Sequence, residues 1–194
     1  MKGEGKSVSV ANVAIALAEM AGTRLCLIDT DFRAPRMREL FGLPEGPGLS
    51  ELLLEEAQLS QVVCETKVRN LFVIRAGREP RNPSELLGSG RIKDLMAVLK
   101  TDYTHILCDT PPINPYTDAA VLGAQLDGVI LVVRMGRTPR EQVVEGLERD
   151  ASRDARRDRE EEVFAQLGEE RDRQPQRAIG QQQLAALDAH GLGH

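Results

Sequence analysis

Apolar residues occur in short blocks along the chain, and the blocks follow two alternating patterns. Four short runs are almost wholly apolar and are bounded by charge or turn residues, which is typical of strands buried on both faces of a parallel sheet. Longer helical patterns separate them. The expected strands are 25–28, 71–74, 105–108 and 129–133, and the expected helices are 7–21, 51–63, 84–100 and 117–125. Strands that alternate with helices predict a layered α/β fold with right-handed crossovers.

The pattern changes near residue 148. Beyond this point Arg, Glu, Asp and Gln dominate and apolar residues become sparse. A segment of this kind buries little surface, so we expect either a solvated helix or a disordered tail. The chain is therefore expected to have two parts, an ordered domain over 1–147 and a charged tail over 148–194.

Composition narrows the classes of function. The net charge is −5, whereas nucleic-acid binders usually carry a basic patch. Aromatic residues make up 3% of the chain and Trp is absent, so few side chains could stack on bases. The three cysteines are widely spaced, which argues against a disulfide framework or a zinc site. No run approaches the ~18 consecutive apolar residues of a membrane span. We expect a cytoplasmic protein that binds no nucleic acid.

A glycine-rich string precedes the first expected helix. Gly3, Glu4, Gly5, Lys6 and Ser7 read GEGKS, the second half of a phosphate loop. In such a loop backbone N–H groups cradle phosphates, the Lys reaches the β and γ oxygens, and the Ser binds Mg²⁺. These residues and the following Val8 are the candidate nucleotide-binding set. Taken alone, the string also fits an ordinary glycine-rich turn before a helix.

Three acidic residues follow two of the expected strands. Asp29 and Asp31 come at the end of the 25–28 run, and Asp109 ends the 105–108 run. Open α/β sheets bind ligands at the carboxyl ends of their strands. Each Asp alone fits a helix cap or a turn. Together with a phosphate loop, they predict a nucleotide and metal site.

Longer motifs give a family resemblance. The strings LIDTDFRAP, AGREPRNPSELLGS, YTHILCDTPPINPYTDA and DGVILVVRMGRTPRE, after GEGKS, resemble the bacterial tyrosine kinases of capsule and exopolysaccharide synthesis, relatives of the MinD and ParA ATPases. The similarity spans about residues 2–144. It implies a P-loop NTPase fold, three α/β/α layers around a mostly parallel sheet, whose first strand is expected to be missing from this chain.

The resemblance also implies roles for the candidate residues. Lys6, Asp29, Asp31 and Asp109 would be catalytic, Ser7, Asp29 and Asp109 would hold Mg²⁺, and ATP would be the phosphoryl donor. Asp29 is the first choice as the base toward a tyrosine hydroxyl, and Asp31 is the second. The implied partner is a membrane-anchored polysaccharide co-polymerase that activates the kinase at the inner face of the membrane, and the intact family self-associates.

Some features depart from the family pattern. The glycine that would open the full loop motif is absent, and the only tyrosines are Tyr103 and Tyr116, so the tyrosine-rich tail is not found. Three functions therefore stay open: a tyrosine kinase or a fragment of one, a MinD/ParA-like switch ATPase whose nucleophile is water, and a non-catalytic fragment.

Overall fold

The computed structural model describes residues 5–113, 116–134 and 136–149, which belong to one compact unit, Met1–Ser152. The charged tail expected over 148–194 lies almost wholly outside the described residues. The strands are β1 (Leu25–Asp29), β2 (Val63–Glu65), β3 (Leu71–Ile74) and β4 (His105–Asp109). The helices are α1 (Lys6–Ala18), α2 (Met37–Leu40), α3 (Leu49–Leu53), α4 (Leu59–Val62), α5 (Pro83–Gly88), α6 (Gly90–Asp102), α7 (Asp118–Gly123) and α8 (Arg140–Arg149).

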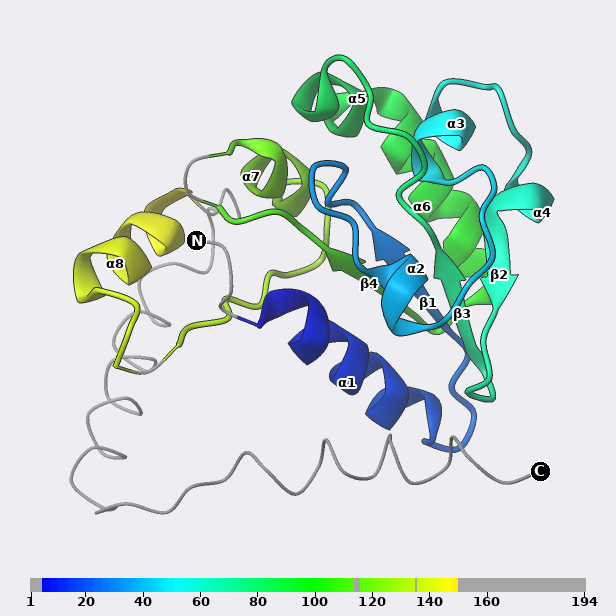
Figure 1. Ribbon diagram of the computed structural model, residues 1–194, viewed down its shortest axis with the longest axis horizontal. Helices are drawn as coiled ribbons and strands as arrows, with labels where there is room; N and C mark the ends of the chain where they lie inside the picture. The colour runs from blue at the N-terminus through cyan, green and yellow to red at the C-terminus, as the bar shows by residue number, and fades with distance from the viewer. Residues whose placement is uncertain (1–4, 114–115, 135, 150–194) are drawn as a thin grey trace. The chain divides into compact units, whose positions relative to one another are not determined.

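The described strands form one sheet in the order β2-β3-β1-β4 (Figure 1). β1 pairs in parallel with both β3 and β4, whereas β2 is an antiparallel edge strand. All five residues of β1 are buried, as expected for a central strand with helices on both faces. The predicted mostly parallel α/β architecture is confirmed.

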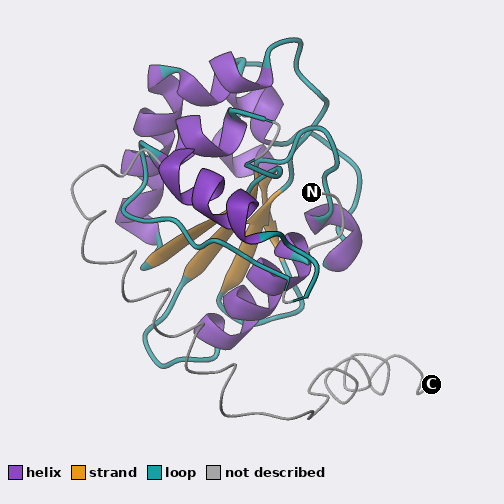
Figure 2. Cartoon of the chain, turned by 90° about the vertical axis from the view of Figure 1, so that its left-hand side faces the viewer, coloured by secondary structure: helices purple, strands orange, loops and turns teal. Residues whose placement is uncertain are grey.

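Helices cover both faces of the sheet (Figure 2). Leu25 and Leu27 of β1 face α1, where they pack with Ala14 and Ala18. The alternate residue Ile28 faces the opposite layer, which is built from α3, α5 and α6. Alternation of side chains along one strand therefore divides the interior into two apolar cores, one on each side of the sheet.

One predicted strand is wrong. Residues 129–133 have no strand conformation, and Val129 and Ile130 are 40% and 77% exposed. A strand exists only where a neighbouring strand accepts its hydrogen bonds. Within the part of the chain that the structure describes, no strand is paired with this run, so its apolar composition alone does not produce one.

Two predicted helices are interrupted. The 84–100 helix divides into α5 and α6 at Ser89, whose extended backbone (φ −70°, ψ 155°) lies between two glycines, Gly88 and Gly90. The 51–63 helix is replaced by α3 and α4, and Glu55 between them takes a left-handed conformation (φ 63°). Two short elements, α2 and β2, and the helix α8 were not among the expected elements.

Candidate active site

The N-terminus of α1 carries the candidate phosphate loop residues. Gly5 precedes the helix in a left-handed conformation (φ 92°), which a glycine adopts without steric cost. The first turn then begins with Lys6, Ser7 and Val8, and its first hydrogen bond runs from the Ser9 amide to the Gly5 carbonyl (2.8 Å). No acidic residue lies in this turn. The end of the helix therefore presents N–H groups and a positive dipole suited to an anion.

Asp109 ends β4 and contacts this helix terminus. The carboxyl group is 2% exposed and accepts a hydrogen bond from the Ser7 hydroxyl. Its second oxygen, Oδ2, is buried and has no hydrogen-bond partner among the described residues. Burial raises the pKa of Asp109 to about 6, against the lowering effects of Ser7 and Lys6, and the charge of Asp31 raises it further. A buried carboxylate oxygen without a partner is a site that a cation would satisfy.

Asp29 lies opposite Asp109 in the register of β1 and β4. Its Oδ2 accepts hydrogen bonds from the amides of Arg36 and Met37, both 2.9 Å long, and its Oδ1 accepts one from Asp31 (3.2 Å). The carboxylate therefore holds the loop that runs from β1 into α2. The sequence did not predict this local role, because the distance between Asp29 and its donors depends on the path of the loop.

Burial raises the pKa of Asp29 to about 7. The hydrogen bond from Met37 opposes this rise, the charge of Asp109 adds to it, and the amides of Arg36 and Asp31 also oppose it. Asp31 is also buried, at 7% exposure, and its Oδ1 accepts a hydrogen bond from the Ala34 amide (3.0 Å).

Electrostatic contacts connect the predicted site residues. Asp109 interacts with Ser7, Lys6 and Asp31, and Asp29 interacts with Asp109. The structure therefore places residues from α1, the β1–α2 loop and β4 together at the carboxyl ends of the parallel strands. Gly3 and Glu4, the other two predicted nucleotide-binding residues, lie outside the described residues.

Known proteins are similar to this chain in sequence and in fold. The Bacillus subtilis tyrosine-protein kinase YwqD is 38% identical over 146 residues, 75% of this chain and 61% of its own length. The crystal structure of the chimerical protein CapA2B2 matches with a TM-score of 0.73 at 35% identity, over 77% of this chain and 66% of that one. The VpsO kinase domain matches with a TM-score of 0.72 at 36% identity, over 76% of this chain and 72% of that domain. The chain belongs to the bacterial tyrosine kinase family.

More distant structures share the fold alone. MinD of Pyrococcus horikoshii OT3, solved with Mg-ADP, has a TM-score of 0.50 at 23% identity, over 57% of this chain and 45% of that one. No family model matches the chain. This member of the bacterial tyrosine kinase family spans about three fifths of the length of some curated relatives and 17–18% of the length of others.

A second polar cluster, around Asp118, was not predicted. Asp118 of α7, 1% exposed, accepts hydrogen bonds from Arg33 Nε (3.2 Å) and from the hydroxyl of Ser84. The Arg33 guanidinium also lies over the Tyr116 ring, 4.4 Å from its centre. One buried carboxylate therefore connects the loop after β1 with α5 and α7. The sequence signals were Arg33, two residues after Asp31, and the Asn82–Leu87 motif that contains Ser84.

The described residues include no group of three or more His, Cys, Asp or Glu side chains arranged to hold a metal ion. Mg²⁺ commonly takes only one or two protein carboxylates and fills its shell with phosphate oxygens and water. A site formed by Ser7, Asp109 and a bound nucleotide fits that preference. Among the described helices, none has the length and apolar character needed to span a membrane.

Proposed function

We propose that this chain is the nucleotide-binding core of a protein-tyrosine kinase that acts in capsule or exopolysaccharide synthesis and transfers a phosphoryl group from Mg-ATP to a tyrosine hydroxyl. The hydrogen bond between Ser7 and Asp109 carries the proposal. It joins the start of α1 to the end of β4, so the phosphate-binding amides and the buried carboxylate face one ligand.

Nucleotide binding would use Gly5, Lys6, Ser7 and Val8, together with Gly3 and Glu4. The amides of Ser7 and Val8 precede the first intrahelical bond of α1 and have no acceptor within the helix. The ammonium group of Lys6 would contact the β and γ oxygens. Because phosphoryl transfer depends mainly on positioning and on neutralising charge, this set supplies most of what the reaction requires.

The residues also fit Mg²⁺, which would neutralise phosphate charge when bound. Ser7 and Asp109 would hold the ion, since the buried Oδ2 of Asp109 has no other described partner. Asp29 was predicted as a further ligand, but its two oxygens already accept three backbone hydrogen bonds. We assign Asp29 a supporting place beside the metal site.

The same hydrogen bonds support a choice between the two candidate bases. Both oxygens of Asp29 are occupied by the amides of Asp31, Arg36 and Met37. Asp31 is buried as well but slightly more exposed, at 7% against 0% for Asp29, and its Oδ1 accepts a hydrogen bond from Ala34. We therefore propose that Asp31 accepts the proton of the tyrosine hydroxyl, and that Asp29 fixes the loop that positions Asp31.

Of the two tyrosines, Tyr103 is a poor candidate for the acceptor, whereas Tyr116 is 37% exposed beside Arg33. Tyr103 is 9% exposed and packs in the core against Phe72, so its hydroxyl is poorly placed for transfer. The test uses a tyrosine-rich peptide and the same peptide with Phe in place of Tyr. Phosphotyrosine on the first peptide alone, lost in Asp109→Asn, supports the kinase. Phosphate release without phosphotyrosine would instead indicate a MinD-like switch ATPase. If the chain shows neither activity and binds no nucleotide, it is a non-catalytic fragment.

We further propose a membrane-anchored polysaccharide co-polymerase as the activating partner, with self-association of the kinase at the inner face of the membrane. Family membership supports this, as does the fact that a relative was solved as the chimerical protein CapA2B2. Addition of a cytoplasmic co-polymerase segment should increase phosphotyrosine formation. A phosphorylation rate that does not respond to the segment would contradict this partner.

A further inference from the structure

Thr30, the residue between Asp29 and Asp31, makes a double contact with the end of β4. Its amide donates a hydrogen bond to the carbonyl oxygen of Asp109 (2.9 Å), and its hydroxyl donates a second bond to the same oxygen (2.5 Å). Thr30 is 1% exposed, so water does not compete for these donors. A carbonyl oxygen has two lone pairs. Thr30 therefore uses the full acceptor capacity of the Asp109 carbonyl group.

These bonds fix β4 at the point where the strand ends. Asp29 and Asp109 are register partners and the last residues of β1 and β4. Beyond Asp109 the chain leaves the strand, and Pro111 and Pro112 have no amide hydrogen with which to extend the ladder. A second bond to the Asp109 carbonyl oxygen restricts rotation of the peptide group that follows. Thr30 therefore sets the orientation of the main chain from which the Asp109 side chain projects.

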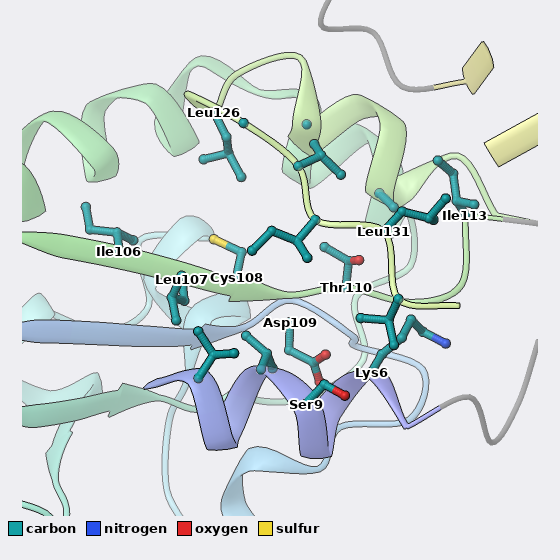
Figure 3. Close-up of a pocket in the computed structure, with 18 of the residues that line it drawn as sticks. Lys6, Ser9, Ile106, Leu107, Cys108, Asp109, Thr110, Ile113, Leu126 and Leu131 are labelled. Carbon is teal, nitrogen blue, oxygen red and sulfur yellow. The ribbon is translucent and has the colours of Figure 1, made fainter. Parts of the chain in front are cut away.

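The same main chain carries the buried carboxylate of the site. The Asp109 side chain points from the end of β4 toward α1 and, with Lys6 and Ser9, lines a cavity of about 410 Å³ beside β4 (Figure 3). The carboxyl group accepts a hydrogen bond from Ser7, whereas its Oδ2 has no hydrogen-bond partner among the described residues. The position of this free oxygen therefore depends on the Ser7 bond and on the main chain that Thr30 holds.

We propose that Thr30 is a positioning residue for phosphoryl transfer, which holds the Asp109 carboxylate, through the Asp109 carbonyl group, in place for Mg²⁺. This role rests on the proposed kinase function. Thr30 is also bonded directly to Asp31, whose charge acts on Asp109. The two hydrogen bonds therefore fix the spacing between the proposed base and the carboxylate that would bind the metal. Loss of a partner that orients a metal ligand typically lowers metal affinity or activity by about 10- to 100-fold.

Thr104 supplies a matched control at the other end of the same strand pair. Its amide and its hydroxyl both donate to the carbonyl oxygen of Arg24, at 2.8 and 3.0 Å. Thr104 precedes β4 at the amino end of the pair, whereas Ser7 and Asp109 meet at the carboxyl end. A comparison of the two threonines therefore separates a role in the site from general support of the sheet.

The first test uses the full chain without nucleotide. Thr30→Val keeps the shape of the side chain and the amide bond to Asp109 but removes the hydroxyl donor. The carboxyl carbon resonance of Asp109, measured by nuclear magnetic resonance at one alkaline pH, should move toward its value in Ser7→Ala. Thr30→Ser and Thr104→Val should retain the wild-type value. An unchanged resonance in Thr30→Val would overturn the proposal, and so would unfolding of this variant, which circular dichroism detects.

The second test adds ADP and uses Mn²⁺ as the probe, with binding measured by electron paramagnetic resonance. Thr30→Val should weaken Mn²⁺ binding about tenfold or more, and Thr30→Ser should restore it. The kcat should fall with the Mn²⁺ affinity, whereas the KM for ATP should change little because the phosphate loop is intact. Equal Mn²⁺ affinities in the wild type and Thr30→Val, or an equal loss in Thr104→Val, would contradict the role of Thr30. A wild-type chain that binds no Mn²⁺ with ADP would contradict the proposed function, and the carboxyl resonance would then decide the role of Thr30.

Discussion

Asp29 and Asp109 are register partners at the carboxyl ends of β1 and β4, and the charge of Asp109 raises the pKa of Asp29. Both carboxyl groups are buried, yet they are stabilised differently. Asp29 accepts three backbone hydrogen bonds, whereas Asp109 keeps one buried oxygen without a described partner. The pair therefore divides into a residue that holds the loop and a residue that is available to a cation.

Lys6→Met should weaken Mg-ATP binding tenfold or more, because a charge-assisted hydrogen bond to phosphate contributes about 1.5 to 3 kcal/mol. Titration calorimetry measures this directly. Lys93→Met serves as the control, since Lys93 is an exposed residue of α6 and does not line the cavity beside β4. Equal affinities in the wild type and Lys6→Met would contradict the phosphate-loop assignment.

Asp109→Asn should reduce turnover by about 10²-fold or more, the order of magnitude for losing one preorganised electrostatic group. The amide retains the shape of the carboxyl group, so the far-ultraviolet circular dichroism should not change. Asp94→Asn, at an exposed position of α6, is the matched control. Loss of structure in Asp109→Asn would show that the buried acid supports the fold and not the reaction.

The free energy of unfolding should fall as the pH rises from about 4 to about 7. The folded chain keeps protons on Asp29 and Asp109, with pKa values of about 7 and about 6, over a range in which the unfolded chain releases them. Stability from these groups is complete below the unfolded pKa of 3.8 and is lost as the pH passes the folded values. Urea unfolding at several pH values should show a smaller fall in Asp29→Asn. If the unfolding free energy of the wild type and of Asp29→Asn depends on pH in the same way, the pKa of Asp29 is not raised.

Gly48→Ala should destabilise the fold by about 1 to 3 kcal/mol, the usual cost of overpacking. A Cβ at this position would meet the backbone nitrogen of Gly77 and the carbonyl oxygen of Arg75. Both are backbone atoms, so they cannot move aside as a flexible side chain would. Gly90→Ala is the control, because a Cβ there meets nothing within 4 Å. Its unfolding free energy should change by less than about 1 kcal/mol. Similar urea midpoints for both variants would contradict the close approach at Gly48.

Asp118→Ala should lower the unfolding free energy by about 1.5 to 3 kcal/mol, since a buried carboxylate bonded to Arg33 and Ser84 is lost. Asp127→Ala removes a carboxylate that is 90% exposed and paired with Lys100, and should cost about 1 kcal/mol or less. Thermal unfolding of the two variants tests the difference. A cost for Asp118→Ala no larger than that for Asp127→Ala would show that the cluster does not stabilise the loop after β1.

The sequence by itself determined three of the four described strands and the placing of Asp29 and Asp109 at the same end of the sheet. The runs at β1, β3 and β4 are apolar because both faces of each strand are covered. This burial can be predicted from the run of apolar residues in the sequence. The placing of Asp29 and Asp109 at strand ends also follows from local order, since parallel strands of similar length end at one edge of the sheet.

Tertiary structure alone decided the features that depend on distant partners. Residues 129–133 have a strand composition but lack a described neighbour to accept their hydrogen bonds. The bonds of Asp29 to Arg36 and Met37, and those of Asp118 to Arg33 and Ser84, require loops to turn back toward each carboxylate. Hydrophobic pattern encodes burial, whereas hydrogen-bond partners are set by which segments meet in space, and for this reason only the three-dimensional structure revealed them.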